Sequence, residues 1–207
     1  MNWLLFNGES TMTKNQQKTI GLVLVDKFAD WEFGLLSAGA AENLGVKVLF
    51  LSPDGLPVTS IGGLEARPSR GITPEENGDL DAVALIGSDT WAEKTAPDVA
   101  PLLAMVQKRG GVIGGICAGT LALAKGGFVQ GLKHTSNGQT WIKKNVGEYP
   151  GADMYQEVPH AVGDSQVITA PGAAPISFAA EFLGSVFPEQ RAAIDAVKRE
   201  FAAEHSK

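Results

Sequence analysis

The stretch Gly115-Ile116-Cys117-Ala118-Gly119 decides how this chain is interpreted. It ends the apolar run 111–116, which is typical of a buried strand, and it leads into residues 118–125, which are compatible with a helix that stops at Gly126-Gly127. A nucleophile between two glycines at a strand-to-helix turn is a nucleophile elbow, here with cysteine in place of serine. We therefore predict that Cys117 is a reactive nucleophile rather than a small buried apolar residue.

The same alternation of strand and helix continues on both sides of the elbow. The predicted strands are residues 20–25, 46–51, 81–86, 111–116, 158–162 and 166–169. The predicted helices are residues 31–44, 97–108, 118–125, 173–186 and 188–203, and a hairpin pairs residues 58–60 with 64–66. This pattern indicates a flavodoxin-like three-layer α/β sandwich, with a mostly parallel sheet between helices on both faces. Ligands bind such sheets beyond the carboxyl ends of the strands, where Cys117 lies.

Length and composition indicate one domain. The chain has 207 residues, of which 44% are hydrophobic and 19% charged, so it carries enough apolar material for a sizeable core. We interpret residues 1–18 as a loose leader and residues 19–207 as the domain. The apolar run Trp3-Leu4-Leu5-Phe6 is too short for an export signal, and Met12 is an alternative start.

Charge and cysteine content limit the function classes. The net charge is −6 and no basic cluster occurs, which argues against nucleic acid or an anionic membrane as a partner. No apolar run approaches the roughly 18–20 residues that span a bilayer. A single cysteine cannot form an internal disulfide, so we expect a reducing cytoplasm as the compartment. Nucleotide-binding glycine motifs are absent and the three histidines lack metal-like spacing, so we expect a small-molecule substrate and neither cofactor nor metal.

A second motif, Phe28-Ala29-Asp30-Trp31-Glu32, follows the first predicted strand. Alone, Glu32 would be a solvated or capping residue at a helix start. Together with the elbow, the motif resembles the ThiJ/PfpI superfamily of the class I glutamine amidotransferase-like fold. The resemblance covers nearly the whole domain and includes the Ile86-Gly87-Ser88 turn and residues 132–137 and 167–172.

The resemblance implies the roles of the site residues. Cys117 would be the nucleophile and Glu32 its hydrogen-bonding, proton-transfer partner. An oxyanion donor would come from the backbone of Ser88 or Gly87, although Ser88 departs from the usual Gly-Gly pair. The start of the helix after Cys117 adds the Ala118 N–H as a second donor, and we expect it to lower the thiol pKa.

The histidines depart from the family pattern. PfpI-like proteases have a histidine directly after the cysteine, where this chain has Ala118, and other branches have one at the position of Asn137. We keep His134 as a candidate helper of Cys117, His160 as a weaker one, and place His205 in the C-terminal tail. Asn137 is a possible pocket residue. Trp31 and Trp91 are either pocket walls beside Cys117 or ordinary packing residues.

Two functions remain open. The first is a cysteine-dependent hydrolase or lyase, of amidase or glyoxalase type, that acts on a small carbonyl or amide compound in stress protection. The second is a non-catalytic redox-sensing stress protein in which Cys117 is oxidised. A ligand-sensing domain of the kind fused to transcription regulators ranks third. The family resemblance also implies a homodimer.

Overall fold

A computed structural model describes residues 17–203 and confirms the α/β sandwich. The strands are β1 (Thr19–Val23), β2 (Lys47–Leu51), β3 (Val58–Thr59), β4 (Glu65–Ala66), β5 (Ala82–Leu85), β6 (Val112–Ile116), β7 (Val162–Asp164) and β8 (Val167–Ala170). Six of them form one sheet in the order β2-β1-β5-β6-β8-β7, in which β7 alone runs antiparallel to its neighbour. The predicted hairpin is confirmed as the separate β3–β4 pair.

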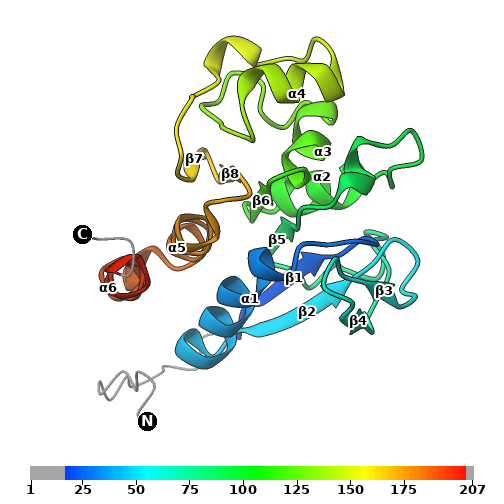
Figure 1. Ribbon diagram of the computed structural model, residues 1–207. Helices are drawn as coiled ribbons and strands as arrows, with labels where there is room; N and C mark the ends of the chain where they lie inside the picture. The colour runs from blue at the N-terminus through cyan, green and yellow to red at the C-terminus, as the bar shows by residue number, and fades with distance from the viewer. Residues whose placement is uncertain (1–16, 204–207) are drawn as a thin grey trace.

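Helices cover both faces of the sheet (Figure 1). The α-helices are α1 (Asp30–Ala38), α2 (Ala100–Lys108), α3 (Gly119–Lys125), α4 (Gln139–Val146), α5 (Pro175–Val186) and α6 (Arg191–Ala202). Short 3₁₀ or π turns are η1 (Gly39–Asn43), η2 (Asp89–Ala92), η3 (Ala152–Met154) and η4 (Pro188–Gln190). Helices α1 and α5 pack on one face with α6 outside α5, while α2, α3 and α4 cover the other.

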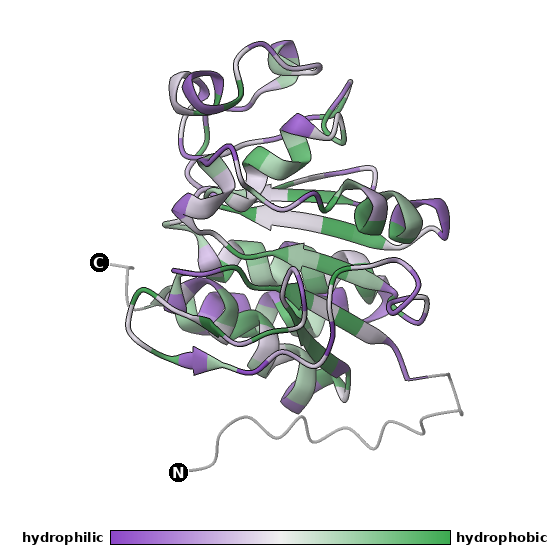
Figure 2. Ribbon diagram, turned by 90° about the vertical axis from the view of Figure 1, so that its right-hand side faces the viewer, coloured by the Kyte–Doolittle hydropathy of each residue, from purple (hydrophilic) through white to green (hydrophobic). Residues whose placement is uncertain are grey.

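The sheet forms the centre of the core. All the residues of β1, β5, β6 and β8 are buried, and Figure 2 shows these strands as a largely hydrophobic band between amphipathic helices. Strands covered by helices on both faces bury both sets of side chains, which explains their continuous apolar runs. Within residues 17–203 no helix combines the length and apolar character needed to cross a bilayer.

Several element boundaries differ from the sequence predictions. The strand predicted at 158–162 begins only at Val162, because Pro159 lacks the N–H that a paired strand requires. Helix α2 begins at Ala100 rather than residue 97, and the Asp98 carboxylate accepts the Ala100 N–H at 3.0 Å. Helix α4 was not predicted; it is one of the short elements whose stability comes mostly from packing.

The predicted leader and tail fall mainly outside the described residues. These include Met12, the Trp3–Phe6 run and His205. Gln17 and Lys18 already contact the domain: the Gln17 side chain donates to Gly45 O at 2.9 Å, and the Lys18 ammonium lies 4.8 Å from the Phe187 ring centroid. Residues 17 and 18 therefore pack against the edge of the domain at which β1 begins.

The elbow has the strained geometry that the glycine pattern predicts. Cys117 connects β6 to α3 with φ of 54°, a left-handed conformation that non-glycine residues rarely adopt. A methyl group on Gly119 would lie 2.4 Å from Leu85 O, and one on Gly115 would lie 2.9 Å from the Gly119 carbonyl. Glycine at both positions therefore lets α3 start directly against β5 and β6.

We expect Gly119→Ala to destabilise the fold by about 1–3 kcal/mol, because the new methyl group meets backbone that cannot move aside. Gly34→Ala is the matched control, since nothing lies within 4 Å of that methyl position in α1 and alanine favours a helix by about 0.5–1 kcal/mol. Urea unfolding of both variants measures the difference. Equal effects would mean that close packing does not explain Gly119.

Candidate functional site

The site lies at the carboxyl edge of the sheet, where β5 and β6 end next to the start of α1. Glu32 is in the first turn of α1, Gly87 follows β5 and Cys117 follows β6. A methyl group on Gly87 would lie 2.4 Å from Glu32 Oε2 and 2.6 Å from Cys117 Cβ. The fold therefore brings together the cysteine and the carboxyl group that the sequence paired, with room between them only for glycine.

Glu32 is a buried carboxyl group with one fixed partner. Its side chain is 1% exposed, and Oε2 accepts the Gly87 N–H at 2.7 Å. No nitrogen or oxygen donor of the described residues reaches Oε1, whose polar neighbour is the Cys117 thiol. A buried acceptor without a donor favours the protonated acid, so Glu32 is suited to donate to the sulfur.

Burial and mutual repulsion govern the two titrating groups. Burial raises the pKa of Glu32 to about 7, against the opposing effect of the Gly87 N–H. Burial, followed by the Glu32 charge, raises the pKa of Cys117 to about 11. The expectation of a lowered thiol pKa is wrong, because desolvation outweighs the helix start. The pair loses its first proton near neutrality, and its two groups share the one that remains.

Asn137 contacts the sulfur from the position at which the family resemblance implied a histidine. Its Nδ2 donates to Cys117 Sγ at 3.1 Å, while its Oδ1 accepts the Gly172 N–H at 2.9 Å. Because the Gly172 N–H can only donate, it fixes Asn137 Oδ1 toward Gly172, and the amide group turns its NH₂ toward the sulfur. Asn137 can therefore stabilise a thiolate but cannot take its proton.

The loop that carries Asn137 is held by hydroxyl groups. Ser136 Oγ lies 2.6 Å from Thr120 Oγ1, and Thr120 Oγ1 also donates to Cys117 O at 2.6 Å. Tyr155 Oη accepts the Ser136 and Gly138 N–H groups at 3.1 and 3.0 Å. These contacts fix Asn137 relative to the elbow. Gly172 was noted in the sequence only as part of a motif, and its position after β8 is what places it here.

The three predicted oxyanion donors are not equivalent. The Gly87 N–H is occupied by Glu32, and the Ala118 N–H interacts with the Cys117 sulfur. Ser88 is extended, its hydroxyl donates to Asp26 O at 2.6 Å, and its N–H has no partner among the described residues. Of the three predicted donors, Ser88 is therefore the one whose N–H has no acceptor among the described residues.

The two tryptophans, Trp31 and Trp91, lie in different environments. Trp31 is 55% exposed and its indole N–H donates to Gly172 O at 3.0 Å, so it lies at the rim of the site. Trp91 is 1% exposed and donates to Ile86 O at 2.8 Å. The structure thus places Trp91 in the core on the α2–α3 side, where it is a packing residue.

Neither described histidine assists Cys117. His134 is buried, and its ring nitrogens pair with Leu132 O and Tyr149 Oη, each at 2.9 Å. Burial also lowers the pKa of His134, which makes it a neutral core histidine. His160 is exposed. Among the described residues, Glu32 is therefore the titratable side chain that interacts directly with the Cys117 thiol.

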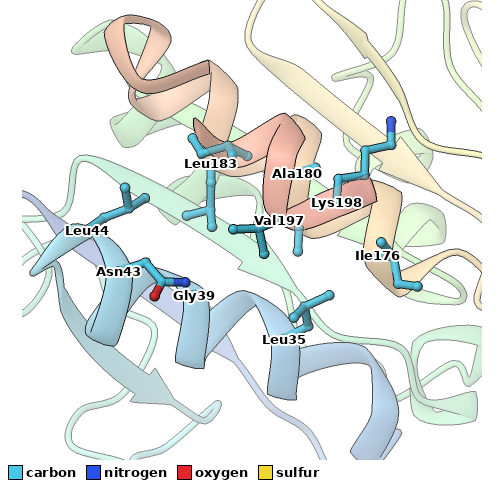
Figure 3. A pocket seen from close by; sticks show the side chains of 11 residues that line it. Leu35, Gly39, Asn43, Leu44, Ile176, Ala180, Leu183, Val197 and Lys198 are labelled. Carbon is cyan, nitrogen blue, oxygen red and sulfur yellow. The ribbon is translucent and has the colours of Figure 1, made fainter. Parts of the chain in front are cut away.

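An apolar cleft lies elsewhere. It separates α1 and η1 from α5 and α6 and is lined mainly by aliphatic side chains, with Lys198 at its edge (Figure 3). Leu35 of α1, Leu183 of α5 and Val197 of α6 point into it. Cys117 is not among its lining residues, so this cleft is separate from the candidate site.

The sequence of the chain matches the DJ-1/PfpI family over residues 18–185. The chain belongs to this family. It is 30% identical over 175 residues to the uncharacterized protease YoaZ of Bacillus subtilis strain 168, a match that covers 81% of this chain and 83% of the relative.

Solved structures of DJ-1/PfpI proteins have the same fold. The DJ-1 superfamily protein Atu0886 from Agrobacterium tumefaciens is 38% identical, with a TM-score of 0.81 over 91% of this chain and all of the other. A thiJ/pfpI family protein from Bacillus anthracis is 30% identical, with a TM-score of 0.73 over 83% of this chain and 84% of the other.

The raised pKa of Glu32 predicts a pH-dependent stability. The folded protein holds this proton up to about pH 7, whereas the ordinary pKa of a glutamate is 4.5. The contribution of this proton to the free energy of unfolding is therefore fully present below pH 4.5 and is lost as the pH rises through 7. Between pH 5 and 8 we expect the wild type to lose about 2–3 kcal/mol relative to Glu32→Gln. Urea unfolding across this range measures it, and parallel pH profiles would contradict a buried, protonated Glu32.

The contacts of the sulfur predict opposite shifts in two variants. Glu32→Gln removes the charge that opposes the thiolate and should lower the thiol pKa, whereas Asn137→Ala removes a donor and should raise it by about 1–2 units. The pH dependence of iodoacetamide alkylation measures both. Asn145→Ala is the matched control, because that amide bonds Trp141 O on α4. An unchanged profile in Asn137→Ala would remove Asn137 from the site.

Proposed function

We propose that this protein is a cysteine-dependent enzyme, a hydrolase or lyase that acts on a small carbonyl or amide compound. Cys117 is the nucleophile and Glu32 moves the proton. The observation that supports this most directly is a carboxyl group with a pKa of about 7 buried beside the sulfur on a strained elbow. Groups of that pKa exchange protons efficiently at neutral pH.

The reactive form is a thiolate beside a protonated Glu32. When Glu32 keeps its proton, the repulsion that adds to burial in raising the thiol pKa is absent, and the donors at Asn137 and Ala118 favour the thiolate. Attack on an aldehyde forms the S–C bond and turns the carbonyl oxygen into an alkoxide. Glu32 then gives its proton to that oxygen and becomes the carboxylate. The Ser88 N–H is our proposed donor to the developing charge.

A 2-oxoaldehyde is the carbonyl substrate that this pair can process further. The Glu32 carboxylate takes the C–H proton from the carbon bonded to sulfur, which leaves an enediol, and returns it to the neighbouring carbon. The hydroxyl proton of the sulfur-bearing carbon passes to the oxygen of the neighbouring carbonyl, so that the first carbon becomes a carbonyl and the second carries the hydroxyl group. The product is a thioester of a 2-hydroxy acid. Water cleaves it to the free acid and restores the thiol, so the net reaction adds one water and needs no oxidant.

Amide hydrolysis makes a greater demand on the site. Loss of an amine requires an acid at the leaving nitrogen and a base for water, and general acid–base help is typically worth a factor of about 10²–10⁴. Asn137 occupies the place of the histidine and can do neither. Because one relative is named as an uncharacterized protease, we include an amide among the compounds to be tested. We rank carbonyl compounds ahead of amides.

Redox sensing is the second candidate. Asn137, Ala118 and Glu32 surround the sulfur with donors that would also bind the oxygens of a sulfinate. Mass spectrometry after mild peroxide distinguishes the two functions. Two added oxygens on Cys117, without turnover of any carbonyl or amide, would favour the sensor. For either function we propose a cytoplasmic homodimer in stress protection, by analogy with the family.

The decisive experiment measures turnover of methylglyoxal and of glutamine by the wild type, Cys117→Ala and Glu32→Gln. We expect methylglyoxal turnover, abolished in Cys117→Ala and reduced at least about 10²-fold in Glu32→Gln. Glu200→Gln, on the exposed side of α6, is the matched control for removing one carboxyl group. Turnover that persists in Cys117→Ala would reject the proposed nucleophile.

A further inference from the structure

Trp31 is an exposed tryptophan whose position is nevertheless fixed. Its side chain is 55% exposed, although tryptophan carries one of the largest apolar surfaces of any residue. Its indole N–H donates to Gly172 O at 3.0 Å, and its backbone belongs to the first turn of α1. One edge of the ring is thus anchored while much of its surface faces solvent, which is the form of a preorganised stacking surface.

Gly172 connects this ring to the reacting atoms. Its carbonyl holds Trp31, its N–H holds Asn137, and a methyl group at its Cα would lie 2.8 Å from Cys117 Sγ and 3.0 Å from Glu32 Oε1. The missing side chain lets the Gly172 backbone lie directly against both the nucleophile and the acid. A substituent on a carbon bonded to Cys117 Sγ would therefore lie next to Gly172, whose carbonyl holds the indole.

The surroundings of Trp31 are also apolar. Most of the exposed large hydrophobic side chains of residues 17–203 lie on the first turn of α1 or around the β3–β4 hairpin: Trp31, Leu56, Ile61 and Leu64. Asp30 fixes the hairpin tip, since its carboxylate accepts the Ser60 hydroxyl at 2.6 Å and the Gly62 N–H at 2.9 Å. Clustered exposed apolar groups at a site indicate an apolar ligand.

We propose that Trp31 determines the specificity of the Cys117 site and selects electrophiles that carry a planar aromatic group next to the reactive carbon. For turnover, this inference rests on the proposed function. The corresponding substrates are aryl 2-oxoaldehydes: the sulfur bonds the aldehyde carbon as before, Glu32 supplies the proton to the oxygen, and the aryl group stacks on the indole. Stacking adds binding that a methyl substituent cannot supply.

The test compares Cys117 alkylation by 2-iodo-N-phenylacetamide and by iodoacetamide, with a small free thiol as the reference. The ratio of the two rates cancels any general change in thiol reactivity. We expect the wild type to prefer the aryl reagent by about two- to twelve-fold over the reference, Trp31→Ala to lose this preference, and Trp31→Phe to keep most of it. The phenylalanine variant retains a ring but not the N–H to Gly172.

Phe201→Ala is the matched control, because Phe201 is an exposed aromatic residue on α6. An unchanged ratio in Trp31→Ala would overturn the proposal. The same unchanged ratio is expected if a second copy of the chain covers this ring. A ratio lost in Phe201→Ala as well would also overturn it.

The turnover ratio of phenylglyoxal to methylglyoxal separates this inference from the proposed function. A ratio that falls in Trp31→Ala supports both. If neither compound turns over in the wild type but the alkylation ratio behaves as expected, the catalytic proposal fails and the aromatic subsite stands. If both compounds turn over and the ratio is the same in Trp31→Ala as in the wild type, only the specificity proposal fails.

Discussion

The left-handed backbone at Cys117 is the constraint on which the site depends. A cysteine with φ of 54° persists only where the surrounding structure enforces it. Here β6 leads into the turn, α3 leaves it, and Gly119 lies so close to Leu85 O that no side chain fits between them. This contact makes the end of β6 rigid and projects the sulfur beyond the sheet, toward the carboxyl group that α1 supplies.

The second determinant is the proton that the buried Glu32 carboxyl group shares with the partly buried Cys117 thiol. The charge of Glu32 is stabilised by the Gly87 N–H and, more weakly, by the Cys117 thiol, and burial outweighs both. Desolvation raises both pKa values, and the charge of either group would disfavour ionisation of the other. The helix start after Cys117 is too weak to reverse this. A protonated Glu32 removes the part of this rise that its charge causes, and the donors at Asn137 and Ala118 favour the thiolate.

Asn137 changes what this pair can do. Its amide supplies a donor to the sulfur but, unlike a histidine, it cannot act as a base. Its orientation is fixed by Gly172, which also anchors Trp31, so the same glycine links the sulfur, the amide and the exposed indole. The site is therefore built for a thiolate that adds to an electrophile, with a single carboxyl group to manage the protons.

The sequence by itself determined the sandwich and the elbow, because buried parallel strands and close turns require particular residues at fixed local spacing. The pairing of Cys117 with Glu32 came from the family resemblance of its motifs. It could not predict α4 or the start of β7, whose limits depend on packing and on one proline. Only the tertiary structure decided that Trp91 and His134 belong to the core, that the Gly87 N–H is occupied, and that the thiol pKa is raised. Burial and contact between distant segments set these properties, and neither is a property of local sequence.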